Sequence, residues 1–273
     1  MKYLYGFFDY KYDLIGFESD IYSLSHIIFL ILAFVSLGFV AYFVRGAKKK
    51  NVEVFIRVLA IFVTVLEVAK LSWESYFDVT RGQGINFFGI APIYTCSLLI
   101  YCSLIAGFAK GKAKDICLSW LCTIGMMTGL ITLFYPTGLN WYPVLTFGGM
   151  HTLLFHYGLV LCAVVCIASG YKKLQWKDIL ISMIPMLALA ILVIPVNYAI
   201  KSDYMQVYEA AGVPVLHDFA TMLASHGLRW LFTIIMLSSY MVLSSIVVAP
   251  YQLVTLLKAK TKKEKEVVVE VSE

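Results

Sequence analysis

Charged residues are scarce in this sequence, and their scarcity excludes most soluble folds. Only 14% of the 273 residues are Asp, Glu, Lys or Arg, whereas 60% are hydrophobic and the mean hydropathy is +0.81. Soluble domains carry about 25% charged residues. Apolar runs long enough for transmembrane helices recur along the chain. Because these runs are continuously apolar rather than alternating, they predict helices instead of a β-barrel.

Motifs for metal binding and disulfides are also missing. The six cysteines lie inside apolar runs, and none belongs to a Cys-x-x-Cys motif. We therefore expect no metal, no cofactor and no disulfide framework, and we interpret most thiols as small buried apolar groups. Residues 1–21 are polar and aromatic and do not resemble a cleavable signal peptide. The interior of the last apolar run (residues 230–255) has no lysine, which excludes a retinal-binding protein.

Seven apolar runs reach the roughly 20 residues that a helix needs to cross a bilayer. They cover residues 22–44, 52–76, 88–109, 115–135, 145–170, 179–199 and 224–255. The sequence thus predicts an all-α polytopic bundle of seven transmembrane helices. It forms one domain, residues 1–257, followed by a charged and disordered tail, residues 258–273.

Basic residues in the connecting segments predict the orientation of this bundle. One group follows the first, third, fifth and seventh runs: Arg45, Lys48, Lys49, Lys50, Lys110, Lys112, Lys114, Lys172, Lys173, Lys177, Lys258, Lys260, Lys262, Lys263 and Lys265. The opposite side has only Lys2, Lys11, Arg81 and Lys201. The positive-inside rule places the N-terminus outside and the C-terminus in the cytoplasm of a cell-membrane protein. Because the lysines sit in separate short loops, nucleic-acid binding is not expected.

Polar side chains concentrate in the outer half of the predicted bundle. They are Glu67, Lys70, Tyr94, Cys96, His151, His156, Asn197, Tyr198, His226 and Arg229. At ~1.5 Å per residue, Cys96 lies ~12 Å and His156 ~15 Å below the outer surface. Polar groups at such depth usually mark a cavity or a path for ions or substrate. We therefore predict an outward-facing polar cavity that binds membrane lipids or another amphiphile.

Two interpretations remain open for the charges of the second run. Glu67, Lys70 and Glu74 share one helical face, so they form either an ion pair that ties this helix to the bundle or an anchor for an anionic headgroup. His151 and His156 are five residues apart and do not share a face, which argues against a two-histidine metal site. Each is more typical of a hydrogen bond between helices than of catalysis.

Cys96 alone is typical of a structural residue, but a histidine at similar depth can activate a thiol. Tyr94 and Cys96 lie about 200° apart on an ideal helix. Both face one cavity only if Pro92 distorts the turn.

Three short motifs resemble a known family. Pro92-Ile-Tyr-Thr-Cys96 is similar to the Pro-Leu-His-Leu-Cys that begins the third span of YwaF-like bacterial integral membrane proteins. Phe155-His156-Tyr-Gly158-Leu is similar to their Ser-His-Gly-Leu, and Asn197-Tyr198 with Asp203-Tyr204-Met205 to their Asn-Tyr…Asn-Tyr-Met. The resemblance spans residues 60–210 and extends more distantly to eukaryotic transmembrane-protein-164-like relatives.

This resemblance implies a chemistry, because the eukaryotic relatives are described as phospholipid acyltransferases with a cysteine acyl carrier and an assisting histidine. It implies Cys96 as nucleophile and His156 as base. We expect Lys70 or Arg229 to hold the headgroup, and Tyr94 and Asn197 to donate hydrogen bonds to the oxyanion. Tyr94 stands where the family has histidine, and a phenol is not a base near neutral pH.

Two other functions fit the same residues. In an ion-coupled or proton-coupled transporter, Glu67, Lys70 and His156 would titrate, although the inverted repeat typical of carriers is not seen. In a non-catalytic sensor or partner subunit, the basic tail would be the docking element.

Overall fold

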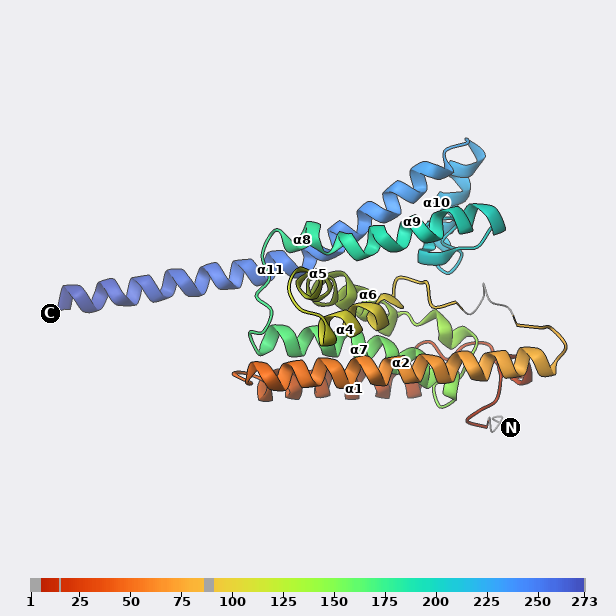
Figure 1. Cartoon of the computed structure of the whole chain (residues 1–273), viewed down its shortest axis with the longest axis horizontal. Coiled ribbons are helices and arrows are strands. Elements are labelled where there is room, and N and C mark those ends of the chain that lie inside the picture. The colour runs from red at the N-terminus through yellow and green to blue at the C-terminus, as the bar shows by residue number, and fades with distance from the viewer. Residues whose placement is uncertain (1–5, 15, 86–90, 273) are drawn as a thin grey trace.

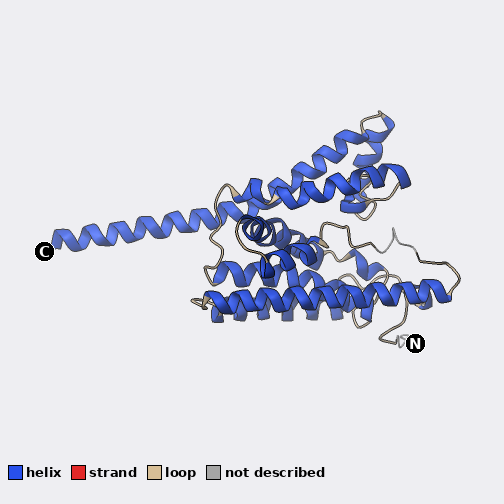
Figure 2. Cartoon of the chain, viewed as in Figure 1, coloured by secondary structure: helices blue, strands red, loops and turns tan. Residues whose placement is uncertain are grey.

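The computed structural model describes residues 6–14, 16–85 and 91–272, and every regular element within these ranges is helical (Figure 2). The longer helices are α1 (Leu24–Phe43), α2 (Lys49–Thr80), α4 (Leu98–Phe108), α5 (Lys112–Trp120), α6 (Met126–Phe134), α7 (Phe147–Ala168), α9 (Met183–Ile200), α10 (Pro214–Ser225) and α11 (Arg229–Ser272). The short elements are η1 (Lys11–Asp13), η2 (Leu121–Gly125), η3 (Thr137–Asn140), α8 (Asp178–Ile181) and η4 (Tyr204–Gln206).

Local chemistry explains where several helices begin and end. The Ser23 hydroxyl accepts a hydrogen bond from the His26 amide at 3.2 Å, and the Thr146 hydroxyl accepts one from the Gly149 amide at 3.3 Å. Each side chain satisfies an amide that the first turn of a helix leaves without a partner, so α1 and α7 start there. Gly46 lies just beyond α1 with φ of 73°, a conformation that costs glycine little.

Five helical stretches are long and apolar enough to cross a membrane. They are Leu24–Phe43, Lys112–Asn140, Phe147–Ala168, Asp178–Ile200 and Arg229–Thr261. All five lie within spans that the sequence predicts or overlap them, so the multi-pass membrane class is confirmed. The second predicted span corresponds to α2, which charged residues interrupt, and the third corresponds to the shorter α4. The full count of seven crossings and the orientation of the termini stay predictions.

The helices form three layers in Figure 1. Helices α1, α2 and α7 lie on one side, α8, α9 and α11 on the other, and α4, α5 and α6 between them. In the middle layer, α4 packs on α2, and α6 packs on α7. The π-helical turn η2 joins α5 to α6 and contacts both α7 and α11, so the centre of the core lies here. Trp120, Leu121 and Ile124 are fully buried at this point.

A close helix–helix contact positions the middle of α7. Gly129 of α6 lies so near α7 that a Cβ atom built on it would be 2.9 Å from the His156 carbonyl oxygen. Because a Cβ carbon does not fit at this distance, only glycine permits the observed approach of the two backbones.

Two parts of the predicted fold differ from the structure. The third span does not begin as a helix: residues 91–97 form an irregular turn, and α4 begins at Leu98. Helix α10 precedes α11 and was not predicted. The backbone of residues 258–272 continues α11 and extends far beyond the bundle (Figure 1), while the division into a domain and a tail stays a prediction. Lys and Glu have high helix propensity, and extending an existing helix avoids the cost of nucleation.

Candidate functional site

A polar cavity of about 490 Å³ lies between α2, the turn 91–97, η3, α7 and the loop after α9. We call it the thiol cavity. Its lining includes six of the residues that the sequence singles out: Glu67, Lys70, Tyr94, Cys96, His151 and His156. The sequence predicted that these side chains converge, and the structure brings them to one cavity.

A buried hydrogen-bonded pair joins α2 to α7 at this cavity. The Nε2 atom of His151 lies 2.9 Å from the Glu67 carboxylate, and both residues are less than a tenth exposed. The His151 ring also stacks on Phe155, with centroids 5.5 Å apart. Removing one partner of such a pair leaves the other buried without compensation. The pair therefore fixes the relative position of the two helices and the orientation of one imidazole.

Lys70 is already paired within its own helix. Its Nζ atom lies 3.0 Å from the Glu74 carboxylate and 4.0 Å from that of Glu67. The structure therefore contains the ion pair that the sequence suggested. It is Glu67, and not Lys70, that connects α2 to α7. Two carboxylates surround one ammonium, so an anionic ligand would meet a largely neutralised lysine.

His156 has a defined proton position. Its Nδ1 atom lies 2.7 Å from the Thr152 carbonyl oxygen. A carbonyl oxygen only accepts, so Nδ1 carries the proton and donates it. In the neutral ring, Nε2 is then the free acceptor. A neighbouring backbone group thus prepares this imidazole to accept a proton at Nε2.

Cys96 lies in the turn that leads into α4, half-buried and unpaired by disulfide. The amides of Ser97, Leu98 and Leu99 donate to carbonyl oxygens three residues earlier, at 2.9–3.2 Å. The thiol therefore belongs to a tight turn that directly precedes the N-terminus of α4 at Leu98. Within the described residues, the Cys96 thiol forms no hydrogen bond with either histidine ring.

Hydrogen bonds from other elements hold this turn. The Tyr101 hydroxyl donates to the Pro92 carbonyl oxygen at 3.0 Å. The Thr95 hydroxyl lies 2.9 Å from that of Tyr240 on α11, and Tyr240 in turn donates to the Met205 carbonyl oxygen at 3.2 Å. Because Met205 belongs to the loop after α9, one chain of hydrogen bonds connects both irregular segments at the thiol cavity.

The loop after α9 has an unusual backbone. Lys201, Met205, Gln206 and Ala210 have φ between 48° and 60°, in the left-handed region. Each such non-glycine residue costs roughly 1–2 kcal/mol. Strain of this kind persists only where surrounding contacts impose it, and it concentrates at functional sites. Here the Asp203 carboxylate accepts hydrogen bonds from three backbone amides of the loop, at 2.9–3.1 Å.

Four predicted site residues lie outside the lining of the thiol cavity. Asn197 is fully buried, and its side-chain amide bonds the backbone of Tyr204, so it supports the loop and is not positioned as an oxyanion donor. Tyr198 packs against Tyr208, and His226 bonds the Met222 carbonyl oxygen. Arg229 forms an ion pair with Glu209 at 3.1 Å. These residues organise segments around the cavity instead of facing it.

Other lining residues were not predicted as site residues. They are Thr132, Thr137, Thr152, Asp203 and Gln206, among others. A signal existed for Asp203, which belongs to one of the motifs that resemble the YwaF-like family. Nothing in the sequence marked the threonines as site residues, because a hydroxyl in an apolar helix normally bonds its own backbone. Thr152 does so with the Gly148 carbonyl oxygen. Across the described residues, no three His, Cys, Asp or Glu side chains gather to hold a metal ion.

Several apolar helices and a polar cavity between them define a multi-pass helical membrane protein. The model of the TMEM164 family matches residues 21–249, and the chain belongs to this family. The match includes every residue that lines the thiol cavity. No curated protein and no solved structure matches the chain.

Proposed function

We propose that this protein binds a membrane lipid with its ester group in the thiol cavity and transfers or hydrolyses the acyl group through Cys96. One observation carries the proposal: a thiol at a helix N-terminus and an imidazole with a free Nε2 acceptor line the same cavity. The acyltransferase chemistry implied by the family resemblance agrees with this pair. The assignment to the YwaF-like bacterial branch belongs to the same proposal.

The bundle crosses the membrane seven times in this proposal. Helices α2 and α4 join the five apolar stretches, with the N-terminus outside, the C-terminus in the cytoplasm and the chain in the cell membrane. The 32 residues of α2 span ~48 Å, which exceeds the ~30 Å of a hydrocarbon core. Its charges at Glu67 and Lys70 face the thiol cavity, which supports a crossing helix with a polar side.

The proposed reaction has two steps. His156 Nε2 takes the proton of the Cys96 thiol, and the thiolate sulfur attacks the ester carbonyl carbon. The tetrahedral intermediate collapses, the bond to the lipid oxygen breaks, and this oxygen takes the proton from the imidazolium. The product is a thioester on Cys96 and a lysolipid. Next, an acceptor hydroxyl or water gives its proton to His156 and attacks the thioester, which releases the acyl group and restores the thiol.

Other lining groups have supporting roles in this proposal. Tyr94 lies at the cavity two residues before the nucleophile, and its hydroxyl donates to the developing oxyanion. Lys70 would bind the lipid phosphate while it remains paired with Glu74, because its ammonium lies 3.0 Å from that carboxylate. Arg229 is not given this role, because it pairs with Glu209 away from the cavity.

A second function is favoured by a different observation. The buried Glu67–His151 pair continues through Lys70 to Glu74, which makes a chain of titratable groups that leads from one wall of the cavity to a carboxylate outside its lining. Such chains serve proton movement in carriers. Uptake of an amphiphile into proteoliposomes that requires a pH gradient, and that survives Cys96→Ala, would favour the transporter over the acyltransferase.

The test is to trap the thioester. Purified full-length protein in detergent is incubated with a phospholipid that carries a fluorescent acyl chain, and protein-bound fluorescence is measured before and after neutral hydroxylamine. We expect hydroxylamine-sensitive labelling that Cys96→Ala abolishes. Cys102→Ala is the matched control, because Cys102 lies on α4 outside the thiol cavity and should keep the label. Equal labelling of the Cys96→Ala protein would exclude the proposed nucleophile.

A further inference from the structure

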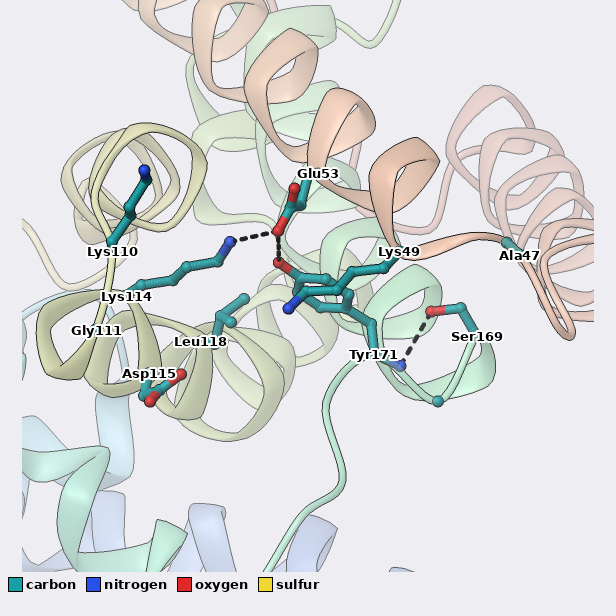
Figure 3. A pocket seen from close by; sticks show the side chains of 11 residues that line it. Ala47, Lys49, Glu53, Lys110, Gly111, Lys114, Asp115, Leu118, Ser169 and Tyr171 are labelled. Atoms are coloured by element: carbon teal, nitrogen blue, oxygen red, sulfur yellow. Dashed lines mark hydrogen bonds and ion pairs between the residues drawn. The ribbon is translucent and has the colours of Figure 1, made fainter.

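A second cavity lies at the other end of the same helices. It has a volume of about 610 Å³ and is formed by the start of α2, the α4–α5 connection, the start of α5 and the segment after α7 (Figure 3). On α2, its residue Glu53 is 17 positions before Lys70 of the thiol cavity, or ~25 Å along the helix axis. We call it the lysine cavity, because Lys49, Lys110 and Lys114 line it.

The charges of the lysine cavity do not cancel. Glu53 accepts hydrogen bonds from Lys114 at 2.9 Å and from the Tyr171 hydroxyl at 3.1 Å. Within the described residues, Lys49 and Lys110 form no ion pair. Figure 3 shows Lys49 and Lys114 extending toward the Glu53–Tyr171 contact, whereas Lys110 and Asp115 lie at the periphery. Lys49 is an exposed residue whose side chain extends toward the cavity, and its ammonium forms no ion pair among the described residues.

Backbone groups add to this positive potential. Helix α2 begins at Lys49 and α5 begins at Lys112, and neither first turn is capped by a side chain. Uncapped first turns leave amide N–H groups free to donate, and both helix dipoles put their positive ends here. Gly111, which lines the cavity, has φ of 67° and turns the chain from α4 into α5. Two amide clusters and three ammonium groups thus surround one space.

We infer that the lysine cavity binds a phosphate group, carried either by an anionic lipid headgroup or by a free phosphomonoester. Ammonium groups and free helix amides are the donors that phosphate oxygens require. The apolar side chains of Ala47 and Leu118 form part of the same wall and fit a glyceryl or acyl segment next to the phosphate. The positive-inside rule accounts for lysines in these loops. It does not account for three of them lining one cavity in which Lys49 has no ion pair among the described residues.

The same loops contain matched controls. Lys112 and Lys48 are exposed, each lies one or two residues from a lining lysine, and neither lines the cavity. Lys112→Gln and Lys48→Gln change the net charge by the same amount as Lys110→Gln and Lys49→Gln. A specific site responds only to the lining substitutions, whereas a diffuse positive surface responds equally to all four.

The experiment measures binding to the full-length protein in an uncharged detergent by isothermal titration. The probes are dioctanoyl phosphatidate, dioctanoyl glycerol, which lacks the phosphate, and glycerol 3-phosphate, which lacks the acyl chains. We expect phosphatidate to show binding that depends on Lys49, and dioctanoyl glycerol to show no binding that depends on Lys49. Lys49→Gln should weaken binding roughly tenfold, equal to about 1.4 kcal/mol. Lys48→Gln and Lys112→Gln should leave it within about twofold.

A substitution of opposite sign sharpens the test. Asp115→Asn removes a negative charge from the rim and should tighten phosphatidate binding severalfold. Binding of glycerol 3-phosphate with similar affinity identifies a free phosphate ester as the ligand, and its failure to bind identifies the lipid headgroup. The inference is overturned if neither phosphate probe binds, or if the control lysines matter as much as Lys49. Cys96→Ala should not change this binding, so the result is independent of the proposed acyl transfer.

Discussion

The thiol cavity and the lysine cavity lie at opposite ends of α2 and α7, but their charged groups are used differently. In the thiol cavity, Glu67 bonds His151 and Lys70 bonds Glu74, so charges are compensated around a thiol and a second imidazole. In the lysine cavity, the Glu53 carboxylate accepts hydrogen bonds from Lys114 and Tyr171. Lys49 has no ion pair among the described residues. No thiol or imidazole lines it.

This difference matches the two proposed roles, acyl transfer in the thiol cavity and phosphate binding in the lysine cavity. A reactive site needs groups with fixed proton positions and a low net charge, since an uncompensated buried charge is costly. An anion site needs unpaired donors and tolerates exposure to water. Helices α2 and α7 connect both environments, because each contributes residues to the thiol cavity and leads at one end into the lysine cavity.

The largest expected effect concerns His156. If its Nε2 atom is the base, His156→Gln should lower the rate of acyl transfer by roughly 10²–10⁴-fold. His217→Gln is the control, since the His217 ring bonds the Glu209 carbonyl oxygen outside the thiol cavity. Rates come from release of labelled lysolipid. If the His156→Gln protein keeps a rate within a few-fold of the unaltered protein, His156 is not the base, and the proposed chemical difference between the two cavities fails.

The next effect concerns the Glu67–His151 pair. Glu67→Gln should lower the free energy of unfolding by roughly 2–4 kcal/mol, because it weakens a buried bond between α2 and α7. Thermal unfolding in detergent measures the loss. The His151→Gln and double variants complete the cycle, and the double variant should lose less than the sum of the two single variants. Strict additivity would mean that the two side chains are not coupled.

A smaller loss of stability is expected where Tyr240 connects the turn 91–97 with the loop after α9. Thr95→Val removes the hydroxyl that meets Tyr240 and should cost about 1 kcal/mol of stability. Thr255→Val is the control, because that hydroxyl bonds only its own helix. If the junction positions Cys96, Thr95→Val also lowers the rate of thioester formation, while phosphatidate binding in the lysine cavity stays unchanged. A change in that binding instead would contradict the independence of the two ends.

The smallest effect concerns an exposed pair outside both cavities. The Arg81 guanidinium donates to Asp13 at 2.5 Å and lowers the pKa of that carboxyl from 3.8. The stabilisation is therefore fully present above the unfolded pKa of about 3.9 and is lost as the pH falls through the lower folded value. Asp13→Asn should reduce the melting temperature slightly at pH 6 and by less at pH 2. An equal reduction at both pH values would show that charge pairing is not the cause.

Much of the thiol cavity could be predicted from the sequence. Glu67, Lys70, Cys96, His151 and His156 stand out because polar side chains inside apolar runs are few. For Glu67, Lys70, His151 and His156, the position along the helix follows from a fixed rise per residue, whereas Cys96 lies in the turn before α4. The error at Asn197 has a physical cause: a buried amide is satisfied either by a ligand or by nearby backbone, and the sequence does not reveal that Tyr204 provides the backbone partner.

By itself, the sequence determined that this is a helical membrane protein and which helices carry polar groups, because hydropathy and helical rise are local properties. Only the tertiary structure decided that residues 91–97 form a turn, that His151 pairs with Glu67, and that a strained loop lines the same cavity. It also decided that lysines from separate loops enclose a cavity. These features depend on contacts between residues far apart in the chain, such as the 84 positions between Glu67 and His151, and no local pattern encodes them.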